Sequence, residues 1–124
     1  MHLWIKLGAI FGGLSVMLGA FGAHSLKNRL TEKSLATFQT GVLYQFIHSL
    51  ALILVGILAI LSVDEQRKKV ERSGWFFAAG IVLFSGSLYT LALGGPRFLG
   101  PVTPLGGLSF MIGWFLFALA VPKK

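Results

Sequence analysis

The chain of 124 residues contains no cysteine and few charged residues. The missing cysteine excludes disulfides and thiolate metal sites. Charged residues make up 12% of the sequence, about half the share found in a soluble domain. Hydrophobic residues make up 55%, and the mean hydropathy is +0.79. These proportions predict an integral membrane protein.

Acidic residues are the scarcest charged type, with four in the whole chain and none inside its long apolar segments. General acid–base catalysis inside the membrane would therefore depend on histidine and tyrosine alone. His24 and His48, without a carboxylate or thiolate nearby in the sequence, make an incomplete zinc or copper set. We therefore expect no enzyme activity, no catalytic residues, no metal and no cofactor.

Four apolar segments are long enough to cross a bilayer core of about 30 Å. They predict an all-α, four-span transmembrane helix bundle that forms a single domain, residues 1–124. The expected spans are residues 4–24, 39–63, 73–94 and 104–121. Residues 25–39 predict a short amphipathic segment at the membrane surface, in which Thr31 caps a helix that starts near Glu32. Residues 64–72 predict a charged loop in water between two antiparallel spans.

The basic residues lie at the ends of the apolar segments, where Lys and Arg meet anionic headgroups. Seven of the eleven fall on the side of the two termini, and four fall on the other side. By the positive-inside rule, both termini are cytoplasmic in a multi-pass protein of the inner or plasma membrane. The charge thus predicts contact with the lipid bilayer and no nucleic-acid binding. For Arg67, Lys68, Lys69 and Arg72, setting the topology is favoured over a phosphate-binding role.

The second span carries a polar face inside an otherwise apolar segment. The residues that share this face at helical spacing are Gly41, Gln45, His48, Ser49, Leu52 and Gly56. A Gln and a His inside a membrane-spanning helix are costly unless they face protein or water. We therefore expect this face to point into the bundle.

Because successive spans alternate in direction, polar groups of all four segments are expected to collect in the outer half of the bundle. The candidate site residues are His24, Tyr44, Gln45, His48, Ser85, Ser87, Tyr89 and Thr103. Two roles compete for them. They form hydrogen bonds that fix helix packing, or they line a polar pocket for a small ligand, an ion or a lipid headgroup.

Four motif blocks then resemble a known family. The blocks are Gly19-Ala20-Phe21-Gly22-Ala23-His24, Phe38 and Thr40 with Tyr44-Gln45 and His48-Ser49, Phe84-Ser85-Gly86-Ser87-Leu88-Tyr89, and Thr103-Pro104-Leu105-Gly106-Gly107 with Gly113-Trp114. They are similar to the small uncharacterised four-helix membrane-protein family that includes bacterial YgdD and YwdK. The resemblance implies an integral plasma-membrane protein without an established activity, and it assigns no ligand residues.

Three hypotheses about function remain open. The leading one is a non-enzymatic membrane component that acts through helix packing and self-associates as a homo-oligomer through small-xxx-small pairs such as Gly8 and Gly12. The second is a binding protein with a polar pocket for an unknown small ligand. The third is an enzyme acting on a membrane-dissolved substrate, for which Glu32 is the only carboxylate close to His24 in the sequence.

Overall fold

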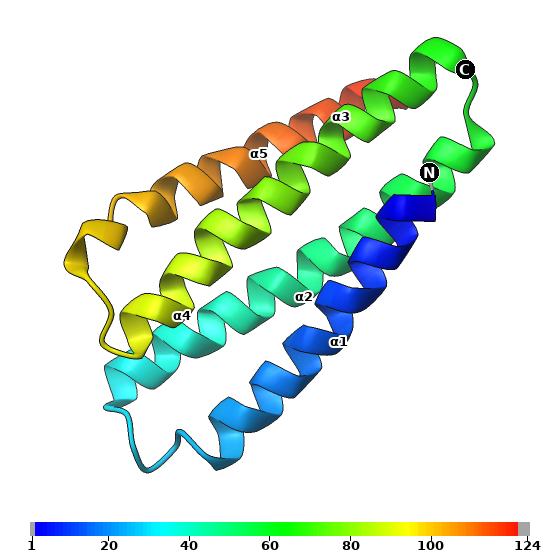
Figure 1. Ribbon diagram of the computed structural model, residues 1–124. Coiled ribbons are helices and arrows are strands. Elements are labelled where there is room, and N and C mark those ends of the chain that lie inside the picture. Colours follow the sequence, from blue (N-terminus) through cyan, green and yellow to red (C-terminus); the bar gives the residue numbers. More distant parts are fainter. Residues whose placement is uncertain (1, 122–124) are drawn as a thin grey trace.

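The computed structural model describes residues 2–121, and every regular element within them is a helix (Figure 1). In chain order these are α1 (His2–His24), α2 (Glu32–Leu61), α3 (Asp64–Gly80), η1 (Ile81–Ser85), α4 (Gly86–Ala92), η2 (Arg97–Leu99) and α5 (Val102–Ala120). Since η1 joins α3 to α4 without a break, four helical stretches are long and apolar enough to cross a membrane. The predicted all-α, four-span fold is confirmed.

The four spans lie side by side in the order α1, α2, α3 with α4, and α5 (Figure 1). α1 packs along α2, and α5 packs along α3 and η1, so α1 and α5 are the outer helices. The start of α1, the turn between α2 and α3 and the end of α5 all lie at one end of the molecule (Figure 1). The core lies mainly between the two middle helices, where Leu52, Val55 and Phe77 are fully buried.

The polar face predicted for the second span does point inward. All six of its residues are buried in α2. The opposite face of the helix carries large apolar side chains that are exposed, as a lipid-facing surface requires. These side chains are Leu43, Phe46, Ile47, Leu50, Leu54, Ile57 and Leu61.

The predicted surface segment at residues 25–39 is not a separate element. Residues 25–30 form turns, and α2 then runs without interruption from Glu32. Thr31 caps it as expected, since the backbone N–H of Ser34 donates to the Thr31 hydroxyl at 3.1 Å. Phe38 is buried in an apolar cluster with Leu26 and Ala92, which holds the polar start of α2 on the bundle.

The charged stretch at residues 64–72 is helical, and the predicted loop there is wrong. It forms the first turns of α3, and the chain reverses within residues 62–63. Arg67 donates to the carbonyl oxygens of Ala59 and Ser62, and Gln66 donates to that of Ala120. These bonds add side-chain donors to carbonyl groups at the ends of α2 and α5, where the last carbonyls of a helix lack the usual donor four residues on. A helix start at residue 64 is therefore favoured over a loop.

The middle of the third span is the π-helical turn η1, in which the Gly86 N–H bonds back to the Ile81 carbonyl. π turns inside α-helices are frequent at functional sites. The wide turn directs Ser85 to α2, where its hydroxyl donates to the Gly41 carbonyl at 2.7 Å. On the other side, the α5 backbone lies directly against it. A Cβ on Gly106 would be 2.7 Å from the Phe84 Cα and closer still to the Phe84 nitrogen.

Candidate functional site

His48 lies near the middle of α2 and is buried. Its Nδ1 lies 2.7 Å from the Tyr44 carbonyl oxygen, and its Nε2 lies 2.9 Å from the indole Nε1 of Trp114 on α5. A carbonyl can only accept and an indole N–H can only donate. The imidazole is therefore neutral with its proton on Nδ1, and both ring nitrogens are satisfied inside the protein.

Aromatic rings surround this imidazole. Its plane stacks on Phe110 with ring centroids 3.6 Å apart and an angle of 10° between the planes. Phe77 and Trp114 contact it at centroid distances of 5.6 and 5.7 Å. The Tyr44 ring packs against Phe84 at 4.8 Å. α2 and α5 are thus bridged mainly by side chains, because their backbones are not in close contact along their length.

A cleft of about 350 Å³ lies beside these rings, and we call it the α2–α5 groove. Its lining residues are Tyr44, His48, Phe84, Gly107, Phe110, Met111 and Trp114. Met111 is 65% exposed and Trp114 is 41% exposed, so the groove is open sideways at the surface that would face lipid. Its volume lies within the range of small-molecule sites, about 300–1,000 Å³.

Gln45 points to the other side of α2. Its Nε2 donates to the Phe11 carbonyl of α1 at 2.8 Å, and its Oε1 accepts from the Tyr89 hydroxyl of α4 at 2.6 Å. One side chain therefore ties together three helices. Gln45 and Tyr89 also line a second cleft, of about 520 Å³, whose other walls are apolar side chains of α1 and the third span.

Removal of the Tyr89 hydroxyl tests how much its hydrogen bond to Gln45 contributes to stability. Tyr89→Phe should lower the free energy of unfolding by about 0.6 kcal/mol and by no more than about 1.7 kcal/mol, the mean and the maximum for hydrogen bonds between membrane helices. SDS titration in bicelles measures this change. Tyr44→Phe is the matched control, because the Tyr44 hydroxyl makes no hydrogen bond within residues 2–121. Equal losses in the two variants would contradict a stabilising role for the Tyr89 bond.

The eight predicted site residues do not meet in one pocket. Gln45 and Tyr89 lie toward α1, while Tyr44 and His48 lie toward α5, because residues three apart on a helix differ in direction by about 60°. Ser85 contacts α2, as described above. The Ser87 and Thr103 hydroxyls bond each other at 2.5 Å between α4 and α5.

His24 stands apart from the other predicted residues. It is the last residue of α1 and is exposed. α1 passes Gln45 at Phe11 and Phe38 at Gly22, so His24 lies beyond the buried polar groups, near the start of α2. Among residues 2–121, no three His, Cys, Asp or Glu side chains come together as a metal site would require. Every buried polar side-chain atom in this part of the chain has a hydrogen-bond partner.

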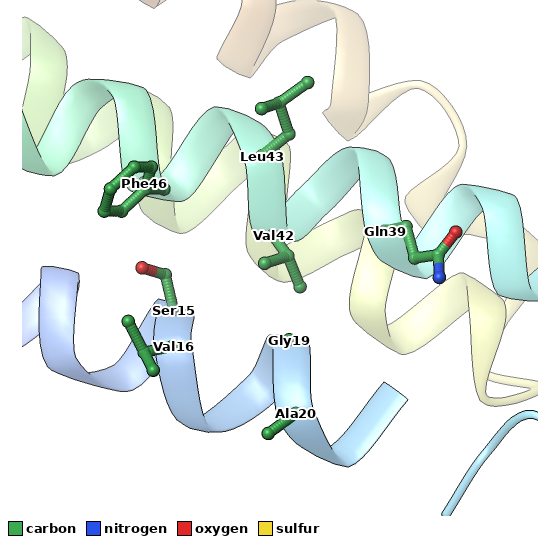
Figure 2. Close-up of a pocket in the computed structure, with 8 residues that line it drawn as sticks. All are labelled: Ser15, Val16, Gly19, Ala20, Gln39, Val42, Leu43 and Phe46. Carbon is green, nitrogen blue, oxygen red and sulfur yellow. The ribbon is translucent and has the colours of Figure 1, made fainter. Parts of the chain in front are cut away.

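A third cleft, of about 370 Å³, follows the seam between α1 and α2 (Figure 2). Val42 of α2 faces Gly19 of α1 there, and Gln39 lies nearer the start of α2 (Figure 2). The Ser15 hydroxyl is turned back to the Gly12 carbonyl of its own helix. None of the predicted site residues lines this cleft, which offers a ligand mainly aliphatic surface.

Four residues of the α2–α5 groove lie on α5 and were missed as site residues: Gly107, Phe110, Met111 and Trp114. Their spacing of three, one and three residues places them on one helical face, which is a signal the sequence does contain. In the sequence, Trp114 stands out only as part of a motif block. Its pairing with His48 joins positions 66 residues apart, and no local pattern indicates that contact.

Four spanning helices with an apolar outer surface define an integral membrane protein. Residues 18–107 match the family described as "Protein of unknown function (DUF423)". The chain is 45% identical over 125 residues to the UPF0382 membrane protein YwdK of Bacillus subtilis. It is 42% identical over 123 residues to the UPF0382 membrane protein SH2409 of Staphylococcus haemolyticus. Each alignment covers 99% of this chain and 98% of the relative.

The chain therefore belongs to this family of uncharacterised membrane proteins, as the motif blocks predicted. No solved structure matches it. The names of these relatives describe membrane proteins without an assigned activity, so a functional argument has to come from the geometry of the chain itself.

Proposed function

We propose that the protein is a non-enzymatic binding protein for a lipophilic molecule dissolved in the membrane, held in the α2–α5 groove. The observation that supports this proposal is the aromatic lining of a cleft that opens sideways near the middle of two spanning helices. Apolar pockets with a few fixed polar groups are the usual form of small-molecule sites.

The ligand expected from this lining has a flat, unsaturated ring. Phe84, Phe110 and Trp114 offer ring faces and edges, and aromatic pairs add about 0.5–1.5 kcal/mol beyond the burial of apolar area. Met111 is flexible and polarisable, so it can adapt to ligands of different outline. Both nitrogens of His48 are already bonded, so ring contacts would hold the ligand in place of new hydrogen bonds.

The glycines also favour this proposal over self-association. Several glycines sit where an added Cβ would lie closer than 3.0 Å to a neighbouring helix of the same chain, so they serve packing within one protomer. These are Gly8, Gly41, Gly80, Gly106 and Gly113. Gly13 and Gly86 have open space around them. Self-association stays a prediction, and crosslinking in lipid nanodiscs would test it.

Binding can be measured with decylubiquinone, a short-chain quinone that quenches tryptophan fluorescence. Wild-type protein in phosphatidylcholine nanodiscs should show a saturable component of quenching on top of the linear part that partitioning produces. Gly107→Leu should abolish the saturable component by filling the groove. The fold should tolerate this change, since a Cβ there meets the Phe84 ring only at 3.8 Å.

The matched control is Gly13→Leu, which adds the same side chain at an exposed position of α1 with no neighbour within 4 Å. This variant should bind as the wild type does. Saturable quenching that survives in Gly107→Leu would contradict the assignment of the groove. Absence of saturable quenching in the wild type, together with no co-purified lipophile by mass spectrometry, would contradict the proposed function.

We further propose that the protein lies in the cell membrane with both termini in the cytoplasm. The charge count of the sequence supports this orientation. Labelling of a cysteine introduced at Lys68 or at Arg97 in intact cells would test it, since these positions lie at opposite ends of the bundle. Only the Arg97 position should react with an impermeant maleimide.

A further inference from the structure

The start of α3 carries a group of basic residues, and the structure separates those that already have partners from those that do not. Arg67 is bonded to the carbonyls at the end of α2, and Lys68 forms an exposed ion pair with Glu65 at 3.5 Å. Lys69 and Arg72 form no ion pair or hydrogen bond with any of residues 2–121. Their charges are available to a ligand.

Lys69 and Arg72 lie on one face of α3, three residues apart, and together they border a cleft of about 270 Å³. The other wall is formed by Leu116 and Leu119 of α5. The cleft therefore pairs two positive charges with apolar surface. A soluble anion would use only the charges, whereas a molecule with an anionic head and an apolar tail would use both walls.

The depth of the cleft is that of a membrane–water boundary. Gln66 bonds to Ala120 at the end of α5, so Lys69 and Arg72 lie beside the last turns of that helix. Trp75, one turn further along α3, is 61% exposed and contacts Trp4 of α1 edge to face at 4.9 Å. Tryptophan side chains are enriched at the headgroup level of bilayers, and basic side chains extend to the same level.

We propose that this cleft, between Lys69, Arg72, Leu116 and Leu119, binds one anionic phospholipid. Its phosphate lies between the ammonium of Lys69 and the guanidinium of Arg72. Its acyl chains follow the α5 surface at Leu116 and Leu119 into the bilayer. Basic pockets between transmembrane helices at the cytoplasmic side are a known form of anionic-lipid site. This site is distinct from the α2–α5 groove, and neither proposal depends on the other.

Native mass spectrometry of protein released from nanodiscs of equal parts phosphatidylglycerol and phosphatidylcholine tests the site. Wild-type protein should retain one phosphatidylglycerol in preference to phosphatidylcholine. The double variant Lys69→Gln/Arg72→Gln should lower the apparent affinity for phosphatidylglycerol about 30-fold, and each single variant about fivefold. Lys68→Gln removes an equal charge outside the cleft and should bind as the wild type does.

The wild type and all these variants should share one melting temperature in pure phosphatidylcholine, because the substituted side chains make no contact that the fold needs. If Lys68→Gln lowered the affinity for phosphatidylglycerol as much as Lys69→Gln or Arg72→Gln, the effect would be one of general charge, and the proposal would be overturned. Unchanged retention in the double variant would do the same. Displacement of the lipid by millimolar inorganic phosphate would also overturn it, because the site would then recognise the phosphate alone.

Discussion

Replacement of Gly106 by valine is expected to lower the free energy of unfolding by about 3 kcal/mol, at the upper end of the usual cost of overpacking. The reason is that α5 crosses η1 with the two backbones in contact. A Cβ at this position would lie 2.7 Å from the Cα of Phe84, and a backbone atom cannot move aside as a flexible side chain can. The whole of α5 would have to shift away from the third span.

Gly107 supplies the matched control, because it is the next residue of the same helix and its Cβ would meet only the Phe84 ring at an ordinary distance. Gly107→Ala should therefore leave the free energy of unfolding within about 0.5 kcal/mol of the wild type. SDS titration in bicelles can compare Gly106→Val with Gly107→Ala directly. Equal free energies of unfolding for the two variants would contradict the close backbone contact between α5 and η1.

Replacement of Trp114 by phenylalanine should lower the free energy of unfolding by about 1–3 kcal/mol, because it leaves the buried Nε2 of His48 without a hydrogen-bond donor. Most of the aromatic contact with His48 and Phe77 remains in a phenylalanine ring, so the loss reports mainly on the hydrogen bond. The cost should fall to within a few tenths of a kcal/mol in a His48→Leu background, where no acceptor is present.

Trp75→Phe is the control for the general cost of shortening a tryptophan in this protein, since the Trp75 indole makes no hydrogen bond within residues 2–121. Trp75→Phe should leave the free energy of unfolding almost unchanged in the same SDS titration. An equal cost for Trp114→Phe with and without His48 would show that the two side chains are not coupled. The neutral imidazole assigned above would then have no support.

Much of the fold follows from periodicity and charge alone. The lengths of the apolar segments predict the number of spans, and the spacing of Gly41, Gln45 and His48 predicts the buried face of α2, which the structure confirms. These features can be derived from sequence because they are local: a helix face is set by a period of 3.6 residues. The Thr31 cap is local in the same way.

What could not be predicted depends on contacts between distant residues. Residues 64–72 form helix, and the acidic first turn at Asp64 and Glu65 is a local signal for it that the predicted loop overlooked. The bonds from Gln66 and Arg67 to carbonyls of α5 and α2 also hold this helix start, and no local pattern shows those partners. The separation of Gln45 from His48 depends on α1 and α5 lying on opposite sides of the middle helices. Because the polar residues were expected at a similar depth in the membrane, a single pocket was the simplest interpretation. Depth alone does not show on which side of its helix a residue lies.

The position of α5 has a consequence for synthesis of the chain. α5 is made after the other three spans, yet it supplies the Trp114 donor for His48 and the Ser109 hydroxyl that donates to the Phe76 carbonyl. Until it inserts, the first three spans expose an unpaired imidazole nitrogen to lipid. An incomplete chain is thus chemically different from a finished one in the middle of the bilayer.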